Sequence, residues 1–396
     1  MDRKQDLFEH IDAMASDLTA LSDFIFDHPE KGLEEHQACA LLTDFLAREG
    51  FDVERGLVGM DTAFRASFDN RSGDGKGPSI GLLCEYDALE DLGHACGHHM
   101  QGPAIVGAAS ALKALCGDRP FRLVVYGTPA EETVGGKILM KERGCFQDID
   151  VALMMHGSPT TTTDVRCLAL ISYEVTFLGR SAHAAIAPEK GRSALDALLL
   201  ACQGIEFLRE HVRDETRLHY TILDAGGPSN VIPARAKGEF SLRSYSTDYV
   251  DSVAKRVRDL FRGAALMAGV TCEIEEKPRY QAKIPVLALN ELLMDNARRL
   301  EAPTLRPPRE KTGSTDFGNV MYDLPGSCIR VAFVDEKASP HSEDYLRAGK
   351  SPEAHRCVLL GAKILAATCW DLVEREETLK AIQGEFGERK EELSRV

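Results

Sequence analysis

The sequence predicts an α/β fold: a main domain with a mostly parallel sheet flanked by helices, and a smaller α+β domain inserted into it. Short continuous apolar runs, typical of strands buried on both faces, alternate with stretches of helical periodicity. In the middle of the chain the pattern changes to strands and amphipathic helices in mixed order, which is typical of an α+β domain. The chain has 396 residues, more than one typical domain.

The main domain takes its strands from four apolar runs. They are Ile80–Cys84, Phe121–Tyr126, Val151–Met155 and Cys328–Val334. Apolar residues at three- and four-residue spacing predict helices over Leu7–Ile25, Ala38–Leu46, Ala104–Leu115 and Ala354–Leu372. Asn70–Pro78 is rich in Gly and charge and predicts a surface loop, and the residues from about Glu374 predict a charged, solvated terminal helix.

The inserted domain is expected over residues 170–279, between two parts of the main domain at 1–169 and 280–396. Its strands are predicted at Leu168–Phe177, His219–Leu223, Gly238–Ser244 and Val270–Glu275. Its helices are predicted at Ser193–Glu210 and Ser252–Met267.

Composition excludes several classes of protein. The formal net charge is −15, which argues against a general binder of nucleic acid or anionic membranes. No apolar run approaches the roughly 18 residues of a membrane span, and the polar start gives no sign of a signal peptide. The 11 cysteines are scattered without CxxC spacing, so we expect mostly reduced, buried thiols in a cytoplasmic protein.

Side chains that can bind metal follow all four apolar runs. They are Glu85, Asp87, Cys96, His98, Glu131, Glu132, His156 and His341. Taken singly, each has an ordinary explanation as a buried thiol, a helix-start charge, a core histidine or a surface residue. The carboxyl ends of parallel strands, however, lie at one edge of a sheet, where ligands bind. Thiolate, imidazole and carboxylate together form transition-metal ligand chemistry, so the sequence predicts a metal site at this edge.

Two adjacent glutamates, Glu131 and Glu132, suit a division of labour. One can bind metal while its neighbour accepts a proton from activated water and later returns it to a leaving amine. Asp87 suits a supporting carboxylate that fixes a ligand histidine or the metal pair.

Eight motifs in order carry a resemblance to a known family. They are Glu85-Tyr86-Asp87-Ala88-Leu89, Gly93-His94-Ala95-Cys96-Gly97-His98, Thr128-Pro129-Ala130-Glu131-Glu132, Met155-His156-Gly157, Gly179-Arg180-Ser181-Ala182-His183-Ala184, Gly226–Pro233, Gly313–Val320 and Pro340-His341-Ser342-Glu343. Over roughly residues 20–370 the chain resembles the M20 metallopeptidases, the aminoacylase/carboxypeptidase-like amidohydrolases. It is most similar to the branch of aminobenzoyl-glutamate hydrolases, auxin-conjugate hydrolases and β-alanyl-dipeptidase-like proteins.

The resemblance implies a catalytic domain with a dinuclear metal site and an inserted lid domain that dimerises. The implied metal ligands are Cys96, His98, Glu132, His156 and His341. Glu131 matches the general base and Asp87 the carboxylate that supports the metals. His183 matches a lid histidine that reaches the partner's site and stabilises the oxyanion, and Asn230 and Arg243 match lid positions that hold a substrate carboxylate. The residues alone also allow a turn or surface role for these last three.

We therefore expect a metal-dependent amidohydrolase that cleaves a small, carboxylate-bearing N-acyl or N-aroyl amino acid or an unusual dipeptide. Two divalent transition metal ions per subunit are expected, Zn²⁺ or Mn²⁺, with Co²⁺ also suited to the ligands. We expect a homodimer or higher homo-oligomer. His99 departs from the Asn or Asp that is usual in relatives. Two alternatives stay open: hydrolytic deamination of an aromatic amine on the same site, and a non-catalytic metal-binding subunit.

Overall fold

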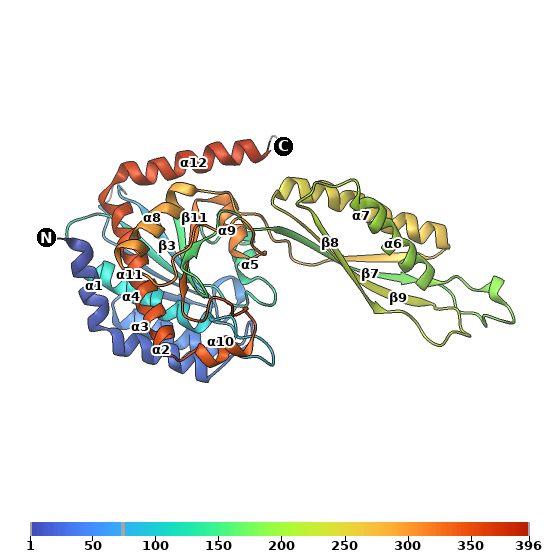
Figure 1. Ribbon diagram of the computed structural model, residues 1–396, viewed down its shortest axis with the longest axis horizontal. Helices are drawn as coiled ribbons and strands as arrows, with labels where there is room; N and C mark the ends of the chain where they lie inside the picture. The colour runs from blue at the N-terminus through green and yellow to red at the C-terminus, as the bar shows by residue number, and fades with distance from the viewer. Residues whose placement is uncertain (1, 73–75, 395–396) are drawn as a thin grey trace. The chain divides into compact units, whose positions relative to one another are not determined.

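The computed structural model describes residues 2–72 and 76–394, so residues 73–75 of the predicted loop lie outside the described residues (Figure 1). The chain forms two compact units. Unit 1 comprises Met1–Arg166 and Lys283–Glu392, and unit 2 has Cys167–Ala282 as its body. Among the described residues, no helix combines the length and the apolar character needed to cross a membrane.

Unit 1 is built on a seven-stranded sheet of order β1-β2-β4-β3-β5-β11-β6. Its strands are β1 (Asp52–Arg55), β2 (Phe64–Asp69), β3 (Ser79–Cys84), β4 (Arg122–Gly127), β5 (Val151–Ser158), β6 (Thr162–Thr163) and β11 (Gly326–Ala332). The four central strands β4, β3, β5 and β11 run parallel, whereas β1, β2 and β6 pair antiparallel at the edges. The predicted α/β fold with a mostly parallel sheet is therefore confirmed.

Helices cover both faces of this sheet (Figure 1). They are α1 (Arg3–Ala13), α2 (Ala15–Asp27), α3 (His36–Arg48), α4 (Gln101–Leu115), α5 (Gly136–Glu142), α8 (Leu287–Arg299), α9 (Phe317–Asp323), α10 (Glu343–Ala348), α11 (Pro352–Glu374) and α12 (Glu376–Ser394), with short 3-10 turns η1 (Leu57–Gly59) and η2 (His98–Met100). Leu82 and Leu153 point into the larger core with α4 and α11, whereas Leu83 and Met154 pack with α5 and α9 on the other face. Strand alternation thus divides the side chains of each central strand between two helix layers.

Unit 2 is a four-stranded antiparallel sheet of order β10-β7-β9-β8 with two helices. Its elements are β7 (Ala169–Leu178), turn η3 (Pro188–Lys190), α6 (Ala194–Arg209), β8 (Arg217–Asp224), β9 (Arg235–Ser244), α7 (Thr247–Ala268) and β10 (Thr271–Glu276). Both helices begin at serine caps: Ser193 accepts from Asp196 N, and Ser246 accepts from Tyr249 N. Burial alternates along β7 and β9, because the helices cover one face of the sheet.

The structure corrects two details of the sequence analysis. The helix predicted over Leu7–Ile25 is interrupted at Met14, whose ψ of 2° ends α1 before α2 begins. His156 does not end its strand, because the ladder with β11 continues to Ser158 and keeps His156 inside β5.

Candidate metal centre

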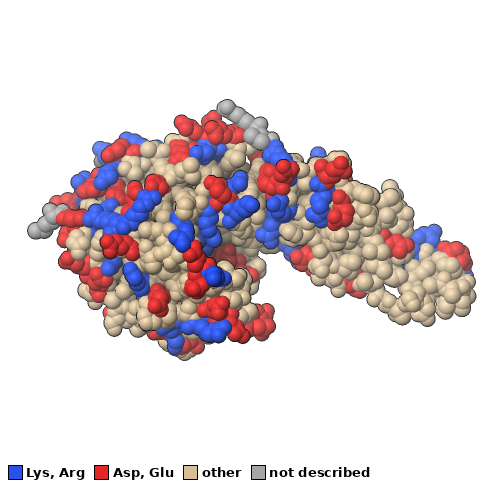
Figure 2. Space-filling model, in the orientation of Figure 1, with Lys and Arg blue, Asp and Glu red and all other residues tan. Residues whose placement is uncertain are grey.

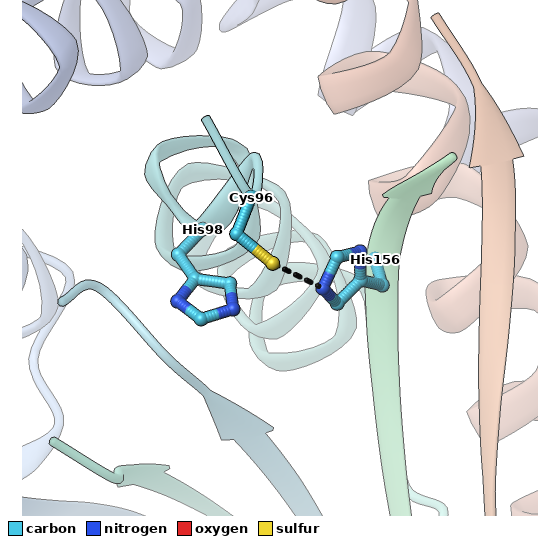
Figure 3. Close-up of side chains that lie close together, drawn as sticks. All are labelled: Cys96, His98 and His156. Carbon is cyan, nitrogen blue, oxygen red and sulfur yellow. Dashed lines mark hydrogen bonds between the residues drawn. The ribbon is translucent and has the colours of Figure 1, made fainter. Parts of the chain in front are cut away.

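The first donor group lies where the segment after β3 meets β5. Cys96 and His98 flank Gly97, which adopts a left-handed conformation with φ 91° at the start of η2. His156 comes from β5, and its Nε2 lies 3.7 Å from Cys96 Sγ. Figure 3 shows the thiol and the two imidazoles facing one another. One donor atom of each residue lies within 4.8 Å of the others.

Neighbouring acceptors fix both imidazoles. His98 Nδ1 donates to the carboxylate and the backbone carbonyl of Asp87, at 3.1 Å each. His156 Nδ1 donates to the carbonyl of Gly157 at 2.6 Å. With Nδ1 used in this way, each Nε2 presents its lone pair to the donor group.

The second donor group adds Glu132 and His341 to Cys96. His341 Nε2 lies 3.3 Å from Glu132 Oε1, and the His341 backbone N–H donates to Ala95 O at 3.0 Å. The other Asp87 oxygen accepts the Glu132 backbone N–H at 2.9 Å. One carboxylate, Asp87, therefore braces a donor in each group.

The residues present fit a divalent transition metal. Glu132 Oε1 is buried and forms no hydrogen bond within the described chain, so it is a free acceptor aimed at the group. Burial raises the pKa of the Cys96 thiol to about 12, a shift that an adjacent divalent cation reverses by stabilising the thiolate. Burial lowers the pKa of His98, but Cys96, Glu85 and Asp87 raise it well above its usual range, so these surroundings favour positive charge.

Glu131 lies between this centre and a buried acidic cluster. It belongs to one group with His98 and Glu132, and to another with Glu85 and Asp316. The fully buried Lys137 ammonium bridges that cluster, 2.6 Å from Glu85 Oε1 and 2.8 Å from Asp316 Oδ1.

The cluster separates the pKa values of its carboxyl groups. Burial raises the pKa of Glu85, but the Lys137 ammonium and His98 outweigh burial and lower it to about 2. Burial, together with the charges of Glu85 and Asp316, raises the pKa of Glu131 well above its usual range. Glu131 is therefore the carboxylate here that most readily accepts and holds a proton.

Lys137, Asp316 and Gln101 were not among the predicted site residues, and Glu85 was noted only for its position after the first apolar run. Gln101 Nε2 donates to Glu85 Oε2 at 2.7 Å and completes the cluster. One signal for Lys137 was present in the sequence: it directly follows Gly135-Gly136 at the start of a predicted helix, where a cation is unfavourable without an acidic partner.

The three lid positions lie in unit 2. His183 and Asn230 are exposed neighbours, and the backbone N–H of Ala184 donates to Asn230 O at 2.9 Å. Arg243 lies near the far end of β9, where burial lowers its pKa. The structure thus brings His183 and Asn230 together and leaves Arg243 at the other end of the strand.

His99 points away from the donor groups. It is fully buried, and its Nε2 donates to Gly349 O at 2.8 Å, in the turn before α11. Its ring meets Phe26 edge-on, with centroids 4.9 Å apart. His99 therefore packs the loop that carries His98 against helices of the larger core.

Known proteins resemble this chain over nearly its whole length. The Xaa-Arg dipeptidase of Mus musculus is 35% identical over 96% of this chain and 90% of that protein. The chain belongs to the M20 peptidase family. One of the two chains of the p-aminobenzoyl-glutamate hydrolase of Escherichia coli K12 is 31% identical over 96% of this chain and 95% of its own length.

Two further comparisons describe the parts of this M20 protein. Residues 169–266 match the family model described as the peptidase dimerisation domain. A solved dinuclear metal-binding M20 peptidase of Bacillus subtilis shares the fold, with a TM-score of 0.70, 18% identity, and coverage of 92% of this chain and 99% of that one. The related proteins named above are hydrolases and peptidases of amide or peptide bonds, as the sequence analysis predicted.

Proposed function

We propose that this M20 protein is a metal-dependent amidohydrolase that cleaves a small N-acyl or N-aroyl amino acid or a dipeptide. The observation that carries the proposal is the convergence of Cys96, His98, His156, Glu132 and His341 into two donor groups that share the Cys96 thiol. The names of its relatives, a dipeptidase and an aroyl-amino-acid hydrolase, support this substrate class.

Cys96, His98 and His156 would hold one divalent ion, and Cys96, Glu132 and His341 the second. Zn²⁺, Mn²⁺ and Co²⁺ all suit this mixture of soft and hard donors. The bound ions would polarise the scissile carbonyl and lower the pKa of coordinated water. Asp87 keeps His98 in the required tautomer and fixes the Glu132 backbone, so the donor positions are set before any ion binds.

Glu131 acts as the general base. Its raised pKa lets it take a proton from the attacking water, hold it, and give it to the nitrogen of the leaving amine. Its neighbour Glu132 is committed to the metal, so the two adjacent glutamates have different roles.

Unit 2 serves as lid and dimerisation domain. Asn230 and Arg243 bind the substrate carboxylate, and His183 of the second subunit stabilises the oxyanion. The outer strand β8 and the adjacent α6 support a homodimer, because they expose Leu199, Phe207, Ile222 and Leu223. On the face of unit 2 seen in Figure 2, broad areas carry no charged side chain.

The first test is hydrolysis by the purified protein after loading with Zn²⁺, Mn²⁺ or Co²⁺. The panel holds N-acyl and N-aroyl amino acids, dipeptides including β-alanyl dipeptides, and aromatic amines, with products identified by mass. Amide cleavage is the expected outcome. Ammonia release from an aromatic amine with all amides intact would instead identify a deaminase, and metal binding without any turnover would identify a non-catalytic subunit.

The base assignment has its own test. Glu131→Gln should lower kcat by at least about 100-fold, because the amide cannot accept the proton. Metal content measured by elemental analysis should stay at the wild-type level. Near-wild-type turnover in this variant would assign the base to another group.

A further inference from the structure

An arginine pair lies beside the candidate metal centre within unit 1. Arg330 stands opposite His156 in the parallel β5–β11 ladder. Ile329 and Val331 point into the larger core, so alternation turns Arg330 to the other face of β11. Met155 likewise points into that core, which puts His156 on the same face as Arg330.

Asp164 holds this arginine and a second one. Its Oδ1 accepts Arg309 Nε at 2.6 Å, and its Oδ2 accepts Arg330 Nε at 2.9 Å. Both arginines use Nε for this contact, and within the described chain their terminal nitrogens form no hydrogen bond. The side chains of Arg309 and Arg330 are 36% and 22% exposed, so solutes can reach them.

The charges of this group are unbalanced. Two guanidinium groups share one carboxylate, which leaves one positive charge uncompensated. Burial and the charge of Arg330 lower the pKa of His156 to about 3, so the arginine acts electrostatically on a candidate metal ligand. A cation beside a metal centre is unfavourable unless an anion lies near both. The free nitrogens of a guanidinium offer the parallel donors that a carboxylate accepts.

We propose that Arg330 and Arg309, held in place by Asp164, bind a second carboxylate of the substrate. This rests on the proposed function, in which Asn230 and Arg243 of unit 2 take the first carboxylate. The inference narrows the substrate class to amides that carry two acidic groups. p-Aminobenzoyl-glutamate, after which one relative is named, is an amide of this kind. The second carboxylate can belong either to the amino-acid side chain or to the acyl group.

Two matched substrate pairs distinguish these positions. N-Benzoyl-glutamate against N-benzoyl-glutamine places the acid on the amino-acid side. N-Succinyl-phenylalanine against N-butyryl-phenylalanine places it on the acyl side. The wild-type protein should favour the acidic member of one pair in kcat/KM by about 10- to 100-fold, which is typical of a charge-assisted hydrogen-bond pair.

Arg330→Gln should reduce that preference by at least about 10-fold, mainly through KM, while kcat/KM for the neutral member changes little. Arg330→Lys should restore part of the preference, and the more exposed Arg309→Gln should reduce it less. Arg306→Gln is the matched control, because Arg306 is half exposed and pairs with Glu336 at 2.8 and 2.7 Å. The control should keep the full preference.

Calorimetric binding of the same four compounds to metal-free protein separates this proposal from the proposed function. A binding preference for an acidic member that Arg330→Gln abolishes supports the subsite even if no amide is cleaved. The subsite is ruled out if the wild-type protein shows no acid preference in either pair, or if the preference survives in both Arg330→Gln and Arg309→Gln.

Discussion

Lys137 carries an ammonium group in the first turn of α5, where the helix dipole disfavours a cation. Asp316 resolves this conflict, since it accepts both the Lys137 backbone N–H at 3.0 Å and the ammonium at 2.8 Å. Glu85 accepts the same ammonium at 2.6 Å, and no part of the lysine side chain is exposed. The lysine thus offsets the charge of buried carboxylates that stand next to the proposed base.

Lys137→Met should lower the free energy of unfolding by about 3–5 kcal/mol at neutral pH, because it leaves buried carboxylates unpaired. The deficit should shrink as pH falls from about 5 toward 2. The Glu85 carboxylate has a lowered folded-state pKa, so its contribution is present above its ordinary pKa of 4.5 and is lost on acidification. Urea denaturation of the metal-free protein at several pH values measures both effects.

Lys141→Met is the control for this experiment. Lys141 lies on the same helix but pairs with Asp323 at the surface, at 2.9 Å, and its loss should cost less than about 1 kcal/mol. Equal losses in the two variants would show that Lys137 does not balance the buried cluster.

At the residue scale, the sequence predicted the donors better than their supports. Cys96, Glu132 and His341 each follow a strand of a parallel sheet, so topology alone brings them to one edge. Asp316 and Lys137 are 179 residues apart, and neither follows a strand directly. Their pairing depends on how α5 packs against α9, which local periodicity does not encode.

At the element scale, the loop between β4 and α5 carries Glu131 and Glu132 and is fastened to the start of α3. Ala130 has a φ of 61°, and its backbone N–H donates to Glu35 Oε1 at 2.8 Å. Glu35 is fully buried, and its other oxygen accepts the Thr62 hydroxyl at 2.8 Å. Burial raises the pKa of Glu35 to about 7, so its protonation state changes in the physiological range.

Glu35→Gln should remove a pH dependence of stability. The raised folded-state pKa means that the unfolded chain loses this proton first, so wild-type stability falls as pH rises from about 5 to 8, by about 3 kcal/mol. An amide can accept from Ala130 and donate to Thr62 without titrating. Denaturation midpoints at pH 5 and 8 measure the slope. Glu30→Gln, at the exposed carboxylate that caps α3, should keep the wild-type slope, and parallel slopes for Glu35→Gln and wild type would contradict the assignment.

Elements with a strong apolar signal were predicted, and those without one were missed. The runs that became β3, β4, β5 and β11 are buried on both faces and contain few polar residues. Edge strand β1 is mostly exposed, so it has no apolar run to find. Helix α9 has only 7 residues, too few to show helical periodicity. Helix α8 was also missed, although its buried Leu289, Leu293 and Ala297 recur at helical spacing.

At the scale of the whole molecule, the proposed mechanism requires two subunits. Glu131 belongs to unit 1 and the exposed His183 to unit 2, where residues 169–266 match the dimerisation domain model. A lid histidine that serves the partner's site makes each active site depend on both chains. An isolated subunit would then bind metal yet turn over slowly.

Mixing two inactive variants tests this arrangement directly. Glu131→Gln removes the base from its own site, and His183→Ala removes the oxyanion donor from the partner's site, so each homodimer should be nearly inactive. In a heterodimer, one site regains both groups. If dimers re-form at random from an equal mixture, about a quarter of wild-type sites are restored, because half of the dimers are mixed and each carries one complete site. Activity is measured before and after reversible subunit exchange. If His183 serves its own subunit instead, both sites of the heterodimer lack a group and mixing restores nothing; the double variant mixed with wild type is the control for exchange.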